Sequence, residues 1–225
     1  MPFGLLAALV IALLSLLGIV GRWCLHGDFD VVHALFSLFF PTNLLICYWE
    51  MCLYFRRDRI GERAEYWRGR QRETGRRAAF AFLSARMSPK RFLSPATGAD
   101  VWAVYSTIDP SYEDRGTLGF SADVGNGFVT PLPTLFLYAA YTLGFVPAVV
   151  AGIVGAMLFW QWAYVSSLYW VSFLLAGRQN QGNVSRGELY VYVGMLNAIW
   201  VLFGLFGTYV SVRLILDGGY GVLGY

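Results

Sequence analysis

The feature that most constrains the fold is a run of 18 residues, Phe3 to Val20, that contains no charged side chain. An α-helix of this length spans most of the hydrocarbon core of a bilayer and satisfies its own backbone hydrogen bonds there. No basic residue precedes the run and no A-x-A cleavage site follows it, so we interpret it as a retained transmembrane helix rather than a removed signal peptide. The chain is therefore expected to be an integral membrane protein.

The composition agrees with this expectation. Of the 225 residues, 57% are hydrophobic and only 14% are charged, which is too apolar a balance for a soluble globule of this size. The net charge of +3 does not indicate nucleic acid binding, because 12 of the 17 basic residues lie between Arg56 and Arg91 with acidic residues among them. A loop beside anionic lipid headgroups explains that cluster, so the membrane is the expected partner.

Further apolar segments predict an all-α, polytopic bundle of five transmembrane helices. The later four are expected at Val31 to Phe55, Leu118 to Val146, Pro147 to Leu175 and Glu188 to Leu216. The expected divisions are residues 1–30 for the first helix and its loop, 31–55 for the second helix, 56–100 for an extramembrane loop, 101–216 for the core and 217–225 for a tail. Pro41 is expected to kink the second helix, and Pro131 and Pro133 are expected to bend the third and open space beside it.

The polar segment from Arg56 to Asp100 differs from the rest of the chain. Its first part has the charge pattern of a solvated helix, and AAFAFLSARM, residues 78–87, has the pattern of a short amphipathic helix at a membrane surface. Only five basic residues lie elsewhere in the chain. The positive-inside rule therefore predicts a cytoplasmic loop, a cytoplasmic N-terminus and a C-terminus on the far side of the membrane.

Few polar side chains occur inside the apolar segments, and each needs a protein partner or a water-lined cavity at membrane depth. They are Asn43, Glu50, Asp123, Asn126, Gln161 and Asn197. Asp123 is the leading functional candidate, because a carboxylate in hydrocarbon costs roughly 3 kcal/mol or more, and Asn126 shares its helical face. The alternatives are a helix-capping role for Asp123, an ion pair of Glu50 with Arg56 or Arg57, and structural hydrogen bonds for Gln161 and Asn197.

Large aromatic side chains accompany these polar groups. They are Trp102, Tyr105, Tyr112, Tyr164, Tyr169 and Trp200. An aromatic cavity with one or two acids suits a hydrophobic ligand that is, or becomes, cationic, because ring faces attract positive charge. The alternative for each ring is an interfacial belt or ordinary packing. The sequence hints at no metal or organic cofactor, and none is expected. The three cysteines form no CxxC pair or ligand cluster, and Cys47 and Cys52, in one apolar helix, are expected to be buried thiols.

Three segments together carry a family pattern. In WAVYSTIDPSY, Trp102, Tyr105, Asp109 and Tyr112 form the run W-x-x-Y-x-x-x-D-x-x-Y, which is followed by Asp123 and by TPL at residues 130–132. The second segment is AYVSSLYW, with Tyr164 and Tyr169, and the third is ELYVYVGMLNAIW, with Asn197 and Trp200. In these motifs the chain resembles the emopamil-binding family, the EXPERA-domain membrane proteins that include the sterol Δ8–Δ7 isomerases.

The resemblance implies a five-helix bundle of EXPERA type and proton-transfer chemistry. An acid protonates one alkene carbon, a carbocation forms, and a base removes a proton from the neighbouring carbon. By family position Asp123 stands at the catalytic glutamate, and it would be the donor or shuttle with Glu50 as the second group, while Trp200 would stabilise the cation. The implied substrate-binding residues are Trp102, Tyr105, Tyr112, Asn126, Tyr164, Asn197 and Trp200.

The chain also departs from the family pattern. The isomerases carry H-x-x-x-E in the second helix, whereas Asn43 and Cys47 stand at those positions here, and neither replaces a carboxylic acid. Glu50, one turn after Cys47, is the candidate to supply the missing group. Asp123 in place of glutamate shortens the side chain by a methylene, and residues 56–100 have no counterpart. The family's lumenal N-terminus conflicts with the positive-inside prediction.

Two functions from different classes are therefore predicted. The first is a double-bond isomerase for a sterol or similar polycyclic lipid, in an endomembrane such as the endoplasmic reticulum. The second is a non-catalytic EXPERA-fold protein that binds lipid or serves as a subunit of a larger membrane complex, which the missing H-x-x-x-E pair favours. Gly152 and Gly155 permit close helix contact within the bundle or between copies of the chain. Asn183-Val184-Ser185 is a glycosylation sequon that the predicted topology would leave unmodified.

Overall fold

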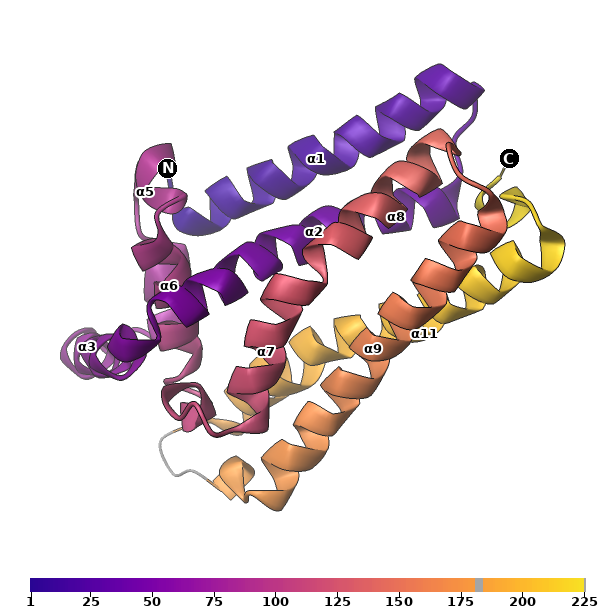
Figure 1. The fold of residues 1–225 in the computed structure, drawn as a ribbon. Coiled ribbons are helices and arrows are strands. Elements are labelled where there is room, and N and C mark those ends of the chain that lie inside the picture. The colour runs from indigo at the N-terminus through magenta and orange to yellow at the C-terminus, as the bar shows by residue number, and fades with distance from the viewer. Residues whose placement is uncertain (181–183, 225) are drawn as a thin grey trace. The chain divides into compact units, whose positions relative to one another are not determined.

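The structure is a computed structural model that describes residues 1–180 and 184–224. The regular structure of these residues is helical, and they form no strand beyond an isolated bridge between Pro2 and Arg86 (Figure 1). The predicted all-α class is therefore confirmed. Asn183 of the glycosylation sequon lies outside the described residues.

Within the described residues, four helical segments are long and apolar enough to cross a membrane. They are α1 (Phe3–His26), α2 (Val31–Phe55), α9 (Ala148–Leu175) and a last segment, Arg186–Asp217. The last segment combines α10 (Arg186–Glu188), the π-helical stretch η4 (Leu189–Met195) and α11 (Leu196–Asp217). These spans indicate a multi-pass membrane protein, as the sequence predicts.

The apolar segment expected as the third span is not one continuous helix. It forms α7 (Leu118–Val129) and α8 (Pro131–Leu143), with a break at Thr130. Pro131 explains the break, because proline has no N–H for the preceding turn but is well suited to the first position of a new helix. The expected bend is thus a complete interruption, and neither half reaches the roughly 20 residues that a span requires. Pro41, by contrast, lies inside the uninterrupted α2.

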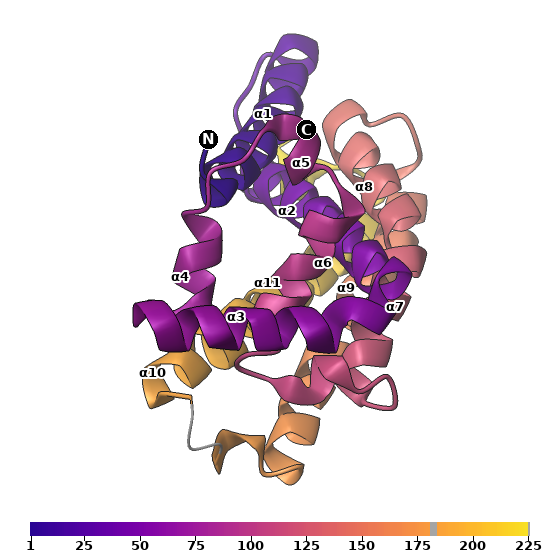
Figure 2. The same cartoon turned by 90° about the vertical axis from the view of Figure 1, so that its left-hand side faces the viewer.

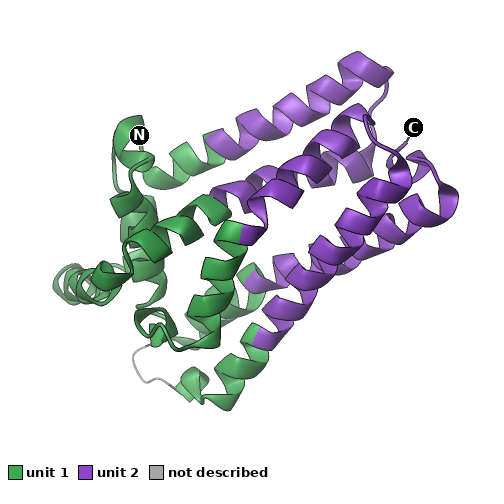
Figure 3. Cartoon of the chain, viewed as in Figure 1, with its two compact units in different colours: residues 1–9, 46–128, 169–196 green, residues 10–45, 129–168, 197–225 purple. Residues whose placement is uncertain are grey.

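The helices divide into two compact units (Figure 3). Unit 1 comprises residues 1–9, 46–128 and 169–196, and unit 2 comprises residues 10–45, 129–168 and 197–225. Each of the four candidate spans contributes residues to both units. The units therefore do not follow the order of the chain.

Residues 56–100 fold largely into helices of unit 1. These are η1 (Arg57–Arg59), α3 (Ile60–Thr74), α4 (Ala78–Leu83), α5 (Pro89–Phe92) and α6 (Pro95–Tyr105). The predicted solvated helix is α3, which buries Ile60, Ala64 and Trp67 at helical spacing and lies against α4 and α6 (Figure 2). The predicted amphipathic helix is α4, and it ends at Leu83, earlier than expected.

The residues after α4 leave the helix to pair with the start of the chain. The Phe3 N–H donates to the Ala85 carbonyl over 3.0 Å, and the Met87 N–H donates to the Met1 carbonyl over 2.8 Å. The buried Phe3 ring packs on Phe82, with 4.3 Å between ring centroids. This pairing satisfies backbone groups that an amphipathic helix through residue 87 would have bonded internally.

The core of unit 1 combines residues from distant parts of the chain. Its buried members are Leu53, Ile60, Ala99, Trp102, Ile108, Tyr112, Phe120, Tyr169, Phe173 and Val193. Two short 3₁₀ turns, η2 (Pro110–Glu113) and η3 (Arg178–Asn180), also belong to this unit. The core includes Trp102 and Tyr112, two of the predicted site residues.

Unit 2 has a mostly phenylalanine and aliphatic core. Its buried members are Phe36, Phe39, Phe40, Leu137, Ala140, Tyr141, Ala148, Ala151, Leu158, Phe159, Trp162, Val210, Leu214 and Leu223. Glycines bring α9 and α11 together, because a Cβ on Gly152 would lie 2.7 Å from the Ser211 carbonyl oxygen. Within the chain, the predicted close contact at Gly152 and Gly155 is therefore made to α11. Leu223 is buried, so the predicted tail packs into this unit.

Candidate functional site

Glu50 is buried in unit 1 and faces α7. Its side chain is 3% exposed, and the Asn126 side-chain amide donates to its Oε2 over 2.6 Å. Asn126 also approaches Cys47, with 3.7 Å from the amide nitrogen to the sulfur. The alternative expectation, an ion pair of Glu50 with Arg56 or Arg57, is wrong, since Glu50 points into the unit and Arg57 donates to the Tyr54 carbonyl.

Gly127 explains how α2 and α7 come close enough for this contact. A Cβ on Gly127 would lie 2.7 Å from the Glu50 Cβ and 3.0 Å from the Met51 backbone nitrogen. These separations are well below ordinary carbon contact distances of about 3.5–4.0 Å. Only glycine permits this approach, so Gly127 sets the distance at which its neighbour Asn126 meets Glu50.

Asp123 lies one turn before Asn126 on α7 and is half-buried. A side-chain hydrogen bond links Asp123 to Tyr112. The carboxyl groups of Asp123 and Glu50 are close enough to interact electrostatically. The capping alternative is wrong, because α7 begins at Leu118, five residues earlier, and Thr117 Oγ1 accepts from the Phe120 N–H at that end. Two carboxyl groups, an amide and a phenol thus share one region of unit 1.

Three of the predicted aromatic residues pack together beside this acid group. The Trp102 and Tyr112 rings stack with 5.0 Å between centroids, and Tyr105 meets Tyr112 edge-on at 5.1 Å. Trp102 donates its indole N–H to the Trp49 carbonyl over 2.8 Å, which fixes its ring plane. Burial and the nearby Asp123 carboxylate raise the pKa of Tyr112 above its ordinary value, so its hydroxyl remains a hydrogen-bond donor.

Asp109 forms a second, structural polar centre in unit 1. Its side chain is fully buried, and it accepts from the Tyr169 hydroxyl over 2.7 Å and from the Ser111 N–H over 3.1 Å. Arg178 forms an ion pair with it at 3.5 Å. Tyr105 lies 3.0 Å from Tyr169, hydroxyl to hydroxyl. Sequence reasoning did not single out Arg178; the only signal was a lone arginine just after the α9 span.

The π-helical stretch η4 receives two side-chain donors. Tyr105 donates to the Tyr192 carbonyl over 3.3 Å, and Trp170 donates to the Val193 carbonyl over 2.7 Å. A π-helix displaces the usual backbone ladder and leaves carbonyls in need of other partners. Tyr105, which packs beside the acid group, and Trp170 therefore hold this irregular segment in place.

The remaining predicted site residues belong to unit 2. The Trp200 indole N–H donates to the buried Asn43 side-chain oxygen over 3.1 Å, and the Asn43 amide donates to Thr134 over 3.3 Å. Tyr164 is 52% exposed and stacks on Trp160, an arrangement typical of a lipid-facing ring. Asn197 is half-buried. The structure thus brings together Glu50, Asp123, Asn126, Trp102, Tyr105 and Tyr112 in unit 1, and Trp200 with Asn43 in unit 2.

The two cysteines of α2 lie where the sequence analysis predicted. Cys47 and Cys52 are buried free thiols, as predicted, and Cys24 is an exposed one. In the described part of the chain, no three histidine, cysteine, aspartate or glutamate side chains are grouped as a metal site requires.

Comparison of the chain with protein-family models, with curated proteins and with solved structures gave no match. The resemblance to the emopamil-binding family therefore rests on the sequence motifs, and the chemistry that it implies remains a prediction. The geometry of unit 1 bears on that chemistry independently of the motifs, since it brings Glu50 and Asp123, which are far apart in the sequence, close enough to interact.

Proposed function

We propose that this protein is a membrane-embedded double-bond isomerase acting on a sterol or a similar polycyclic lipid, in an endomembrane such as the endoplasmic reticulum. The observation that supports the proposal is the buried Glu50, which accepts a hydrogen bond from Asn126 and interacts electrostatically with Asp123 on the neighbouring helix. Two carboxyl groups in low-dielectric surroundings favour one neutral and one charged form. Such a pair offers an acid and a base at the same time.

The proposed reaction moves one double bond and needs no oxidant or reductant. The buried Glu50 first passes its proton to Asp123, which acts as a shuttle and gives the proton to one alkene carbon, so that positive charge develops on the other. Glu50 removes a proton from the next carbon, whose bonding electrons form the new double bond. Glu50 is then protonated again, as at the start of the turnover. Asn126 orients Glu50 throughout.

The aromatic cluster supports the charged intermediate in this proposal. The faces of Trp102, Tyr105 and Tyr112 attract positive charge, by about 0.5–2 kcal/mol for a cation over each ring. The Tyr112 hydroxyl holds Asp123 by a side-chain hydrogen bond. No cofactor enters these steps.

The test is turnover of a Δ8-sterol by the purified full-length protein. The position of the double bond in the product is read by NMR or mass spectrometry. Asp123→Asn and Glu50→Gln are each expected to abolish turnover, while Asp114→Asn, which removes an exposed carboxylate after η2, is expected to keep it. An unchanged sterol with the wild-type protein, under conditions in which a known isomerase turns over, would refute the enzymatic proposal.

A second candidate is a non-catalytic protein that binds a hydrophobic lipid or serves as a subunit of a larger membrane complex. The hydrogen bond between Trp200 and Asn43 favours this candidate. Both residues stand at active-site positions of the family pattern, and here they bind each other. Saturable binding of the Δ8-sterol without any product would support this candidate. Turnover that depends on Asp123 would exclude it.

A further inference from the structure

A pocket of about 370 Å³ lies in unit 1 and is separate from the acid group. It is formed by the residues directly after α2, by the start of α3 and by the start of α6. Its walls are Arg56, Arg59, Ile60, Arg63, Arg91, Ser94, Ala96, Thr97, Ala99 and Asp100. Ile60 and Ala99 are buried apolar residues, so the rest of the lining is mainly polar and strongly basic.

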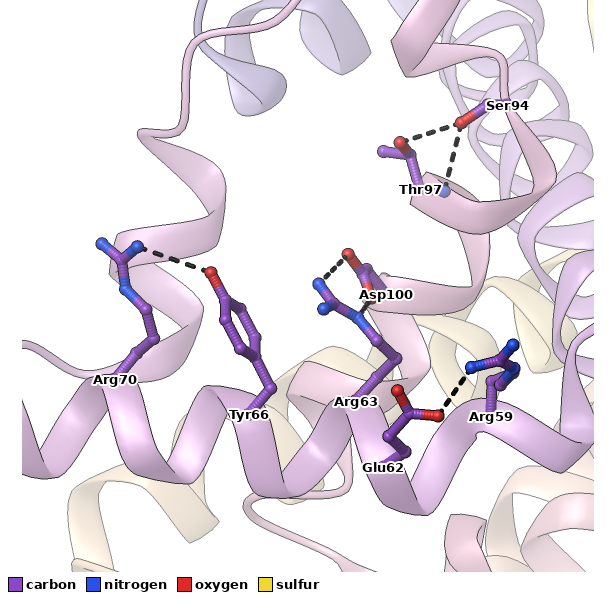
Figure 4. A network of polar contacts seen from close by, with 8 residues as sticks. All are labelled: Arg59, Glu62, Arg63, Tyr66, Arg70, Ser94, Thr97 and Asp100. Carbon is purple, nitrogen blue, oxygen red and sulfur yellow. Dashed lines mark hydrogen bonds and ion pairs between the residues drawn. The ribbon is translucent and has the colours of Figure 1, made fainter.

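The charge of the pocket is positive, since four arginines face one aspartate. Arg63 forms a two-point ion pair with Asp100, at 2.7 and 2.8 Å, and Arg59 pairs with the exposed Glu62 at 2.8 Å (Figure 4). Within the described residues, the guanidinium groups of Arg56 and Arg91 form no ion pair. Two cationic groups are thus available to a ligand, and planar guanidinium groups are well suited to bind phosphate oxygens.

The amino end of α6 also favours an anion in the pocket. Ser94 caps this 11-residue helix by accepting from the Thr97 N–H over 3.3 Å, and Ser94, Ala96 and Thr97 all line the pocket. The amino end of a helix carries partial positive charge that stabilises a nearby anion. The helix end and the arginines therefore favour the same kind of ligand.

The position of the pocket along the chain indicates where that ligand lies. Arg56 follows Phe55, the last residue of the candidate span α2. Tyr54, Phe55 and Phe128 pack their partly exposed rings together beside it, with 5.4 to 5.9 Å between centroids. Aromatic rings at the end of a span mark the membrane interface. We therefore expect the pocket to lie at the level of lipid headgroups.

We propose that this pocket binds the phosphate of an anionic lipid headgroup, such as that of phosphatidic acid. The chemistry that it recognises is a phosphate monoester, which free inorganic phosphate shares in part. Arg56 and Arg91 supply the direct contacts, and the Arg63–Asp100 pair holds the wall between α3 and α6. The proposal is independent of the acid group and of the isomerase activity.

The test uses the full-length protein in a non-ionic detergent. Binding of dioctanoyl phosphatidic acid, dioctanoyl phosphatidylcholine and inorganic phosphate is measured by isothermal titration calorimetry. The double variant R56Q/R91Q is expected to bind phosphatidic acid about a hundredfold more weakly, since each of the two lost charged contacts contributes roughly 1.5 kcal/mol and about 1.4 kcal/mol corresponds to a factor of ten. The matched control R70Q/R76Q removes the same charge from exposed positions outside the pocket and is expected to bind normally.

Each outcome decides the proposal. Selective binding of phosphatidic acid that R56Q/R91Q loses and R70Q/R76Q keeps supports a lipid site. If inorganic phosphate displaces phosphatidic acid at similar concentrations, the pocket is an anion site whose ligand is a soluble phosphate rather than a lipid headgroup. Equal losses in the two double variants, or binding of phosphatidylcholine as tight as that of phosphatidic acid, overturns it. Gel filtration and thermal unfolding of R56Q/R91Q exclude misfolding as the cause of a loss.

Discussion

Replacing Gly127 by alanine would force α2 and α7 apart where Asn126 bonds Glu50. The added Cβ would lie 2.7 Å from the Glu50 Cβ, 3.0 Å from the Met51 nitrogen and 3.1 Å from the Cys47 carbonyl oxygen. Two of these atoms are backbone, so no side-chain rotation relieves the clash. To restore a normal contact distance, the two helices must move apart by about 1 Å. The 2.6 Å hydrogen bond would then exceed the range in which such a bond is effective.

The magnitude follows from three contributions. Overpacking costs about 1–3 kcal/mol, and leaving the buried Glu50 without its donor costs about 1–3 kcal/mol. Removing glycine from a helix interior returns about 1 kcal/mol. The expected net loss in the free energy of unfolding is about 1–5 kcal/mol, which lowers the melting temperature by about 2–4 °C per kcal/mol in a chain of this length.

The assay is thermal unfolding of the purified protein in detergent, with Gly125→Ala as the matched control. Gly125 lies on the same helix two residues earlier, and a Cβ there would meet nothing within 4 Å. The control should therefore be neutral or more stable by up to about 1 kcal/mol. Equal melting temperatures for the two variants would refute the argument that Gly127 sets the contact between Asn126 and Glu50.

Three further substitutions test other contacts. Asp109→Asn leaves the largely buried Arg178 without its counter-charge and should cost about 3–5 kcal/mol in thermal unfolding; a loss below about 1 kcal/mol would contradict a structural role. Trp200→Phe removes the donor to Asn43 and should cost about 1–2 kcal/mol, which an unchanged melting temperature would disprove. Asp100→Asn removes the one carboxylate of the pocket lining but keeps a side-chain oxygen that can accept from Arg63, so the wall is retained and phosphatidic acid binding should tighten several-fold in calorimetry, whereas weaker binding would argue against an anion site.

The sequence predicted those elements whose signals are local. The helix α3 follows from charged residues around Ile60, Ala64 and Trp67 at helical spacing, and the spans follow from long apolar runs. Pro131 was correctly expected to disturb the third apolar segment. Its effect was underestimated, because proline at the first position of a helix stabilises a new start as well as opposing continuation.

The partners in the candidate site could not be obtained in the same way. Glu50 has arginines six and seven residues later, and nothing local in the sequence distinguishes an ion pair there from a contact with Asn126, 76 positions away. The choice depends on how α2 and α7 are brought into register, which Gly127 permits. The arginine pocket depends on the packing of α3 against α6, so the basic composition of the loop predicted an anionic neighbour but not a defined cavity.

The interruption at Thr130 has a consequence for biogenesis. The machinery that inserts nascent chains into a bilayer selects segments by hydrophobic length, and α7 and α8, with 12 and 13 residues, are both too short to be accepted singly. This region is expected to enter the lipid only together with the following span, α9. Co-translational assembly of that part of the chain would then precede the completion of any binding cavity.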